Sequence, residues 1–178
     1  MNAFKNDLHD LVARHVAAAP PAKLLHLVES LAGDPEPAPA AVGFDVRPRF
    51  LKLDAAGRET TGDHVAVYDH STDLVWTAEP LGEFKHGDAM NACADLELLG
   101  SKGWRAPTIQ ELLSIVDYTR CDPAIDSDFF KGPYGWTWSA TEAASPSGFA
   151  WGVYLLDGDS SRLNQGYHAH VLAVRAGQ

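Results

Sequence analysis

Apolar residues recur at helical spacing in four stretches of the chain, and each stretch predicts an amphipathic helix. The four stretches span residues 4–17, 24–31, 86–99 and 108–118. The pair Pro20-Pro21 interrupts the first two, and Gly33 follows them as a helix stop. Residues 1–33 are therefore predicted to form an N-terminal helical hairpin.

Alternation of apolar and polar residues, together with turn residues, predicts short strands in the rest of the chain. The predicted strands cover residues 49–53, 65–68, 74–77, 136–140, 149–156, 161–165 and 168–175. The dipeptide Asp157-Gly158 is typical of a hairpin turn between two of them. Strands, then two helices, then a run of strands indicate an α+β fold.

Residues 34–47 divide the chain, because a stretch rich in Pro and Ala is typical of a semi-rigid, extended spacer. We expect a helical hairpin at residues 1–33, a linker at 34–47 and a main domain at 48–178. A hairpin of this size cannot bury the apolar stripes of both helices by itself. It must dock on the main domain, on another protein or on a second copy. The intervening linker favours the last two, so we expect a homo-oligomer formed through the hairpin.

The most specific local pattern is a helix start at residues 104–113. Thr108 and Glu111 have the Thr-x-x-Glu spacing of a capping box, in which the hydroxyl and the carboxylate each accept from a backbone N–H. Pro107 stops the helix from starting earlier, and Trp104 is placed to pin the entering chain to the core. This pattern predicts an architectural corner, since it contains no nucleophile paired with a base.

The corner is one of several motifs that, in order, resemble the Lcl C-terminal domain family, known from bacterial collagen-like adhesins and common in bacterial and phage proteins. The matching segments are residues 69–76, 89–96, 104–112, 136–141 and 171–175. The structural motif residues that they carry are Trp76, Trp104, Arg105, Pro107, Thr108, Glu111, Trp138, Ser139 and Arg175. Asp73, Ala106 and Leu172 depart from the family pattern, which has Gly, Leu and Arg there. The resemblance covers residues 48–178 and implies a C-type-lectin-like domain.

The charge balance narrows the expected partners. The chain has 14 Lys and Arg against 24 Asp and Glu, a formal net charge of −10, which disfavours direct binding to nucleic acid or to anionic membranes. The excess of acidic residues either keeps the protein soluble or forms a surface that binds a basic partner. No apolar run of about eighteen residues predicts a membrane span, and the charged N-terminus is unlike a signal peptide. We expect a cytoplasmic or virion-associated protein.

The sequence contains few residue clusters that are typical of metal binding or catalysis. Cys93 and Cys121 are the only cysteines, and two buried thiols are favoured over one disulfide or a zinc site. His168 and His170 alternate on a predicted strand without a third ligand nearby, so a solvent-facing pair is favoured over a metal site. The turn at residues 157–160 lacks the remaining ligands of a calcium loop. No common catalytic or phosphate-binding motif occurs, so we expect no metal, no cofactor and no enzymatic activity.

Aromatic residues crowd the last third of the chain, with polar residues between them. Trp138 and Trp151 are expected in the core. The candidate binding residues lie on the short strands and loops and are Tyr134, Tyr154, Arg162, Asn164, Tyr167 and His168. Such a set, if exposed, forms a recognition face of the kind that dominates binding hot spots. The alternative, that all of these residues pack internally, is equally open.

These observations favour a non-enzymatic recognition or structural module, with a protein or a surface glycan as its ligand. The most concrete setting is a phage or prophage protein that displays a lectin-like domain on a tail fibre or similar appendage. The alternative is an acidic intracellular phage protein that inhibits a host defence complex, comparable to an anti-CRISPR protein. An enzyme of unknown chemistry ranks third.

Overall fold

The structure is a computed structural model, and it describes residues 47–177. The chain divides into two units, Met1–Val46 and Arg47–Gln178. The predicted helical hairpin at residues 1–33 and nearly all of the predicted linker lie outside the described residues and stay predictions. The following description concerns the second unit.

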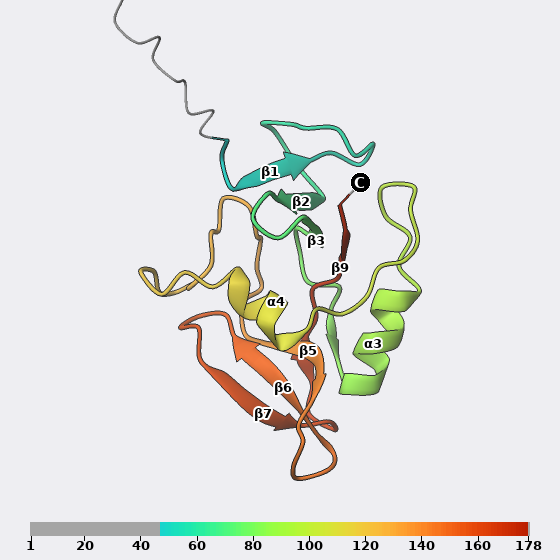
Figure 1. The fold of residues 1–178 in the computed structure, drawn as a ribbon, viewed down its shortest axis with the longest axis vertical. Helices are drawn as coiled ribbons and strands as arrows, with labels where there is room; N and C mark the ends of the chain where they lie inside the picture. Colours follow the sequence, from blue (N-terminus) through green and yellow to red (C-terminus); the bar gives the residue numbers. More distant parts are fainter. Residues whose placement is uncertain (1–46, 178) are drawn as a thin grey trace, which may run out of the picture. The chain divides into compact units, whose positions relative to one another are not determined.

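The first sheet has four antiparallel strands in the order β1-β2-β3-β9. Their bounds are β1 Phe50–Leu53, β2 Ala66–Asp69, β3 Leu74–Thr77 and β9 Val174–Ala176. The first three follow each other in the sequence and confirm the predicted strands within a residue or two. The fourth comes from the end of the chain, so this sheet joins the two ends of the domain (Figure 1).

The second sheet has five strands in the order β4-β8-β5-β6-β7. Their bounds are β4 Glu83–Phe84, β5 Trp136–Glu142, β6 Phe149–Tyr154, β7 Ser160–Asn164 and β8 Ala169–His170. Strands β5 to β7 form an antiparallel meander, and β8 pairs in parallel with β5 at a single position. Gly158 has a φ of 85° in the turn between β6 and β7, which confirms the predicted hairpin.

Both predicted helices of this unit are present but shorter than expected. Helix α3 spans His86–Ala94 instead of 86–99. The end of the predicted stretch forms a tight turn instead, in which Leu98 pairs with Ser101, and Leu99 and Gly100 have φ values of 55° and 64°. Helix α4 spans Ile109–Ser114 instead of reaching residue 118. Val116 there forms a β-bridge with Ile125, so long-range pairing outweighs the helical periodicity.

The single strand predicted for residues 168–175 is wrong. The structure splits this segment into β8 and β9, which belong to different sheets. Residues 171–173 between them are fully or almost fully buried. The apolar run is therefore a crossing through the interior of the domain, and its hydrophobicity comes from burial on every side.

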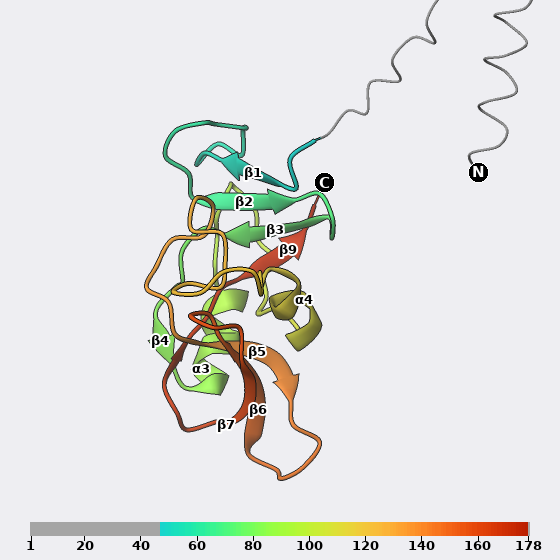
Figure 2. The same ribbon diagram turned by 90° about the vertical axis from the view of Figure 1, so that its left-hand side faces the viewer.

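The two sheets lie at opposite ends of this unit; α4 lies between them, and α3 lies beside β4 and β5 of the second sheet (Figure 2). One apolar cluster joins the first sheet to α4 and β6, and includes Trp76, Leu112 and Val153. A second cluster packs α3 against Trp104 and Trp138. The described unit is thus a small, mostly β, α+β domain. The C-type-lectin-like architecture stays a prediction at this level.

The predicted corner at residues 104–113 connects the two sheets. Arg105 exchanges two backbone hydrogen bonds with Val174 of β9, at 2.9 and 2.8 Å. On the other side, the N–H of Ala140 in β5 donates to the carbonyl of Pro107 at 2.7 Å. The indole N–H of Trp104, which is 2% exposed, donates to the carbonyls of the preceding loop. The corner is therefore the joint that fixes one sheet relative to the other.

The capping box predicted within the corner is also present. The N–H of Glu111 donates to Thr108 Oγ1 at 3.2 Å, and the N–H of Thr108 donates to Glu111 Oε2 at 2.7 Å. Arg105 donates to both carboxylate oxygens of Glu111, at 2.8 and 2.6 Å. Arg175 of β9 lies over the Trp104 ring, 5.4 Å from its centroid. Arg105, Thr108 and Glu111 are thus bound to each other at the start of α4, and Arg175 packs on Trp104.

Candidate functional site

A solvent-facing hollow of about 400 Å³ lies at one end of the second sheet. We call it the aromatic hollow, because four aromatic residues contribute to its wall. It is lined by Glu83, Tyr134, Gly135, Trp136, Tyr154, Tyr167, His168, Ala169 and His170. Four of the six candidate binding residues are thereby brought together by segments that are well separated in the sequence.

Strand register builds one wall of the aromatic hollow. Trp136 begins β5 and Tyr154 ends β6, and these two residues are direct cross-strand partners. Their ring centroids are 5.2 Å apart with the planes inclined at 39°. Cross-strand aromatic pairs of this kind stabilise a sheet. The pair therefore holds two rings at the edge of the hollow without help from a loop.

A histidine and a carboxylate lie beside this wall. Glu83 of β4 and His170 of β8 are cross-strand partners, and His170 Nε2 lies 3.4 Å from Glu83 Oε1. The His170 residue is only 9% exposed, and its buried Nδ1 has no hydrogen-bond partner among the described residues. The pair is charged on both sides only when the imidazole is protonated.

Several polar groups of the aromatic hollow have no hydrogen-bond partner among the described residues. No hydrogen bond to another described residue is formed by the hydroxyls of Tyr154 and Tyr167 or by the imidazole of His168. Tyr167 is 50% exposed. Polar side chains that face solvent without internal partners can bind a ligand without first losing a hydrogen bond within the protein.

Tyr134 contributes to the hollow in a different way. Its hydroxyl donates to the carbonyl of Phe130 at 2.8 Å, and its ring packs against the first apolar cluster. Burial raises the pKa of this phenol above its ordinary value. The structure therefore makes Tyr134 a half-buried wall residue and corrects the expectation that it is freely exposed.

The structure separates the remaining two candidate binding residues from the hollow. Arg162 on β7 donates to the carbonyl of Ser145 at 2.6 Å. Asn164 Oδ1 accepts from the N–H of Gly166 and shapes the turn after β7. Both residues are exposed, but neither lines the aromatic hollow. The predicted set is therefore not one continuous site.

The solvent-facing histidine pair is also wrong. His168 is exposed and precedes β8, whereas His170 is buried within the sheet. Among residues 47–177 no group of three or more His, Cys, Asp or Glu side chains is arranged to hold a metal ion.

The two cysteines are both free thiols. Cys93 is fully buried on α3 as expected, and burial raises the pKa of its thiol to about 12. Cys121 is exposed, so the expectation of two buried thiols is wrong for this residue. The thiolate of Cys93 is suppressed at neutral pH, which removes the form that acts as a nucleophile.

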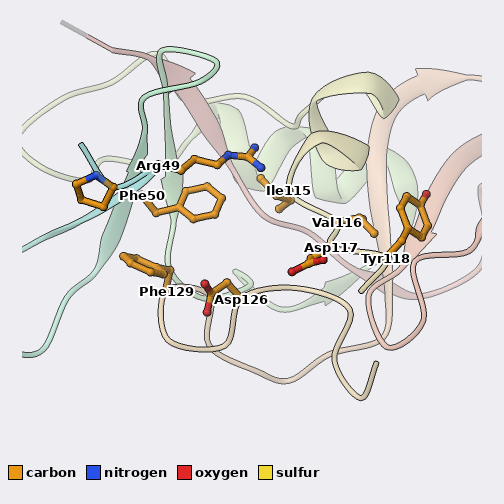
Figure 3. Close-up of a pocket in the computed structure, with 9 residues that line it drawn as sticks. Arg49, Phe50, Ile115, Val116, Asp117, Tyr118, Asp126 and Phe129 are labelled. Atoms are coloured by element: carbon orange, nitrogen blue, oxygen red, sulfur yellow. The ribbon is translucent and has the colours of Figure 1, made fainter. Parts of the chain in front are cut away.

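A second hollow, of about 500 Å³, lies beside β1 and the loop after α4 (Figure 3). We call it the loop groove. Figure 3 shows the rings of Phe50 and Phe129 at one end, Tyr118 at the other, and the carboxylates of Asp117 and Asp126 between them. No sequence pattern predicts this groove, since irregular segments form most of its wall.

The charged groups of the loop groove already have partners in the protein. Arg49 donates to both carboxylate oxygens of the buried Asp69, at 3.1 and 2.9 Å, and to the carbonyl of Ser114. Burial alone would raise the pKa of Asp69, but its hydrogen bonds, chiefly from Arg49, hold this pKa below the ordinary value. Arg120 forms ion pairs with Asp117 and Asp126. These contacts make the groove a structural joint, and the aromatic hollow is the better candidate site.

Five residues that line the aromatic hollow were not among the predicted binding residues, and three of them have polar or aromatic side chains: Glu83, Trp136 and His170. Trp136 carried an aromatic signal but was assigned to a family motif. Glu83 lies on a strand of two residues, which is too short for a periodic pattern. Only the pairing of β4 with β8 brings its carboxylate to the hollow.

The fold and the hollow together define a small α+β domain with a preformed aromatic site and with no metal cluster among its described residues. The profile of the Lcl C-terminal domain family matches residues 65–175, and the chain belongs to this family. The membership confirms the family resemblance and indicates a bacterial or phage module of the adhesin type. No curated protein shows significant similarity to the chain. Within the described part, no helix has the length and apolar character required to cross a membrane.

Proposed function

We propose that the chain is a non-enzymatic recognition module that binds a surface glycan or a protein through the aromatic hollow. The single observation that supports this most is that Tyr154, Tyr167 and His168 line the hollow and form no hydrogen bond to another described residue. The proposed setting is a phage or prophage particle that displays a C-type-lectin-like domain on a tail fibre or appendage.

The chemistry of the hollow supports a binding role over catalysis. Its wall contains no Ser, Thr, Cys or Lys beside His168 or His170, so it lacks the hydroxyl–histidine and thiol–histidine pairs that act in many covalent mechanisms. The buried Cys93 lies on the apolar face of α3 and is protonated at neutral pH. We therefore propose that no covalent step takes place at this site.

A second candidate function is inhibition of a basic protein complex inside the host cell. The observation that favours it is that many Lys and Arg side chains are already paired within the chain. Arg49, Arg58, Lys102, Arg105, Arg120 and Lys131 all form ion pairs with carboxylates of the same chain. With a net charge of −10, the exposed surface has an excess of carboxylates that suits a basic partner.

Binding of the labelled full chain to intact cells of candidate host strains and to a glycan array tests the proposal. Tyr167→Ala and His168→Ala change exposed residues of the hollow, and each is expected to weaken binding about fivefold or more, since truncated hot-spot residues cost about 1 kcal/mol or more. Tyr118→Ala is the matched control, because Tyr118 is 71% exposed and lines the loop groove instead.

Loss of binding in Tyr118→Ala alone would move the site to the loop groove. Binding of the native chain to neither cells nor glycans, together with capture of a basic host complex, would favour the inhibitor.

A further inference from the structure

The charge of the aromatic hollow restricts the ligands that it accepts. Its nine lining residues include one carboxylate, Glu83, and no Lys or Arg. The Glu83 side chain is 62% exposed. An anionic ligand would lose hydration beside this carboxylate with no fixed positive charge to replace the lost water. The composition of the wall therefore disfavours sulfate, phosphate and carboxylate groups.

The Glu83 carboxylate is not paired with a Lys or Arg side chain of the described residues. Among the described residues its only ionic contact is the one to His170 Nε2, at 3.4 Å, and this contact neutralises the carboxylate only when the imidazole is protonated. By contrast, the carboxylates of Asp69 and Glu111 are each held by two hydrogen bonds from one arginine. Glu83 is thus the carboxylate at the hollow that remains available to a cation from outside.

The aromatic residues add a second attraction of the same sign. Trp136, Tyr154, Tyr134 and Tyr167 all contribute to the wall, and the faces of indole and phenol rings attract organic cations electrostatically. The free hydroxyl oxygens of Tyr154 and Tyr167 can also accept hydrogen bonds from an N–H donor. A carboxylate beside several electron-rich rings is a combination that suits an ammonium group on an apolar stem.

We infer that the aromatic hollow binds an organic ammonium group, with Glu83 as its counter-ion and the ring pair Trp136 and Tyr154 against its stem. This inference rests on the proposed function, because it takes the hollow as the recognition site. The group has two sources, which are a lysine side chain of a partner protein and a free or surface-linked alkylammonium such as choline. The net charge of −10 attracts either source toward the domain.

The decisive measurement compares two ligands with the same four-carbon stem on the unmodified full chain. N-acetyl-lysine methylamide and N-acetyl-norleucine methylamide differ chiefly in the terminal ammonium group. In an NMR titration, the resonances of residues at the hollow are expected to shift on binding. The dissociation constant of the lysine derivative is expected to be at least tenfold lower than that of the norleucine derivative. Choline, titrated in parallel, identifies the source: tighter binding than the lysine derivative indicates an alkylammonium, and weaker binding indicates a lysine side chain.

A charge-removing variant provides an independent test. Glu83→Gln is expected to weaken binding of the tighter cation about tenfold or more. The control Glu97→Gln removes the same charge from a side chain that is 63% exposed and paired with Lys102, and it is expected to leave binding unchanged. Thermal melting of both variants shows whether the fold is retained. If Glu83→Gln unfolds, the comparison of the two ligands on the native chain still decides.

Equal binding of the lysine and norleucine derivatives, or no binding of any of the three ligands, would overturn the assignment of a cation. The proposed function fails separately, when Tyr167→Ala and His168→Ala leave binding to cells and glycans unchanged. The two proposals can therefore be distinguished by experiment.

Discussion

At the scale of single residues, the Glu111 carboxylate accepts three hydrogen bonds from two residues of the corner. Its carboxylate accepts from both guanidinium nitrogens of Arg105 and from the N–H of Thr108. The hydrogen bonds from Arg105 outweigh the effect of burial and, with the one from Thr108, lower the pKa of Glu111 to about 2. The ionised form is therefore part of the folded structure.

We predict that this lowered pKa makes the stability of the domain dependent on pH. Because the pKa of Glu111 lies below its ordinary value of 4.5, its stabilising effect is complete above that value and is lost as the pH falls toward 2. Glu111→Gln should reduce the free energy of unfolding by about 1–3 kcal/mol at pH 7 and by progressively less below pH 4.5. Urea melts of both proteins between pH 7 and 2.5 measure this difference.

The control for this prediction is Glu97→Gln, since the exposed pair of Glu97 with Lys102 has an N–O distance of 3.6 Å. Such a surface pair contributes at most about 1 kcal/mol, and the variant should show little change with pH. A destabilisation by Glu111→Gln that stays constant down to pH 2.5 would contradict the ionised cap.

At the scale of elements, the β6–β7 hairpin depends on a glycine that touches a distant segment. Gly158 has a left-handed φ of 85°. A Cβ at this position would lie 2.7 Å from Val116 Cγ1 and 2.9 Å from the ring of Tyr118. The hairpin turn and the segment after α4 are thus packed directly against each other.

We predict that Gly158→Ala destabilises the domain by about 1–3 kcal/mol, through backbone strain and through overlap with Val116. Gly87→Ala is the matched control. Gly87 lies in α3 with a negative φ and with no atom within 4 Å of an added Cβ, so the change should stabilise the helix by about 0.5–1 kcal/mol. Thermal melting of the two variants measures both effects, and equal shifts of the melting temperature would refute the proposed overlap.

At the scale of the whole molecule, the corner at residues 104–113 makes the two sheets one structural unit. It provides a partner for β9 of the first sheet and a backbone contact to β5 of the second. The hollow is lined by Trp136 at the start of β5, whereas the corner contacts Ala140 farther along that strand. Ligand-contacting residues can therefore vary without disturbing the corner.

The helical hairpin predicted at residues 1–33 gives a prediction about assembly. Its two apolar stripes require a partner, so the full chain is expected to self-associate, and a shortened chain that begins at Arg47 is expected to be a folded monomer. Light scattering gives the molar mass of each, and circular dichroism verifies the fold of the shortened chain. Equal, monomeric masses would mean that the hairpin docks on its own chain or binds a different protein.

Local patterns in the sequence determined a large part of this protein. The first three strands, the β6–β7 hairpin and the capping box of Thr108 and Glu111 were all predictable, because each depends on residues close together in the chain. The family was also predictable, because its motifs are the residues that build the corner and the core around it.

Only the tertiary structure decided where the site lies and which residues form it. Glu83 meets His170, and Trp76 meets Val174, through strand pairs whose members are far apart in the sequence. Residues 171–173 are a second example. An apolar run of this kind occurs both in a strand and in a buried segment that crosses between two sheets, so the sequence does not distinguish them. Side-chain periodicity reports how each residue is buried, but the partner that buries it is chosen by packing of the whole chain.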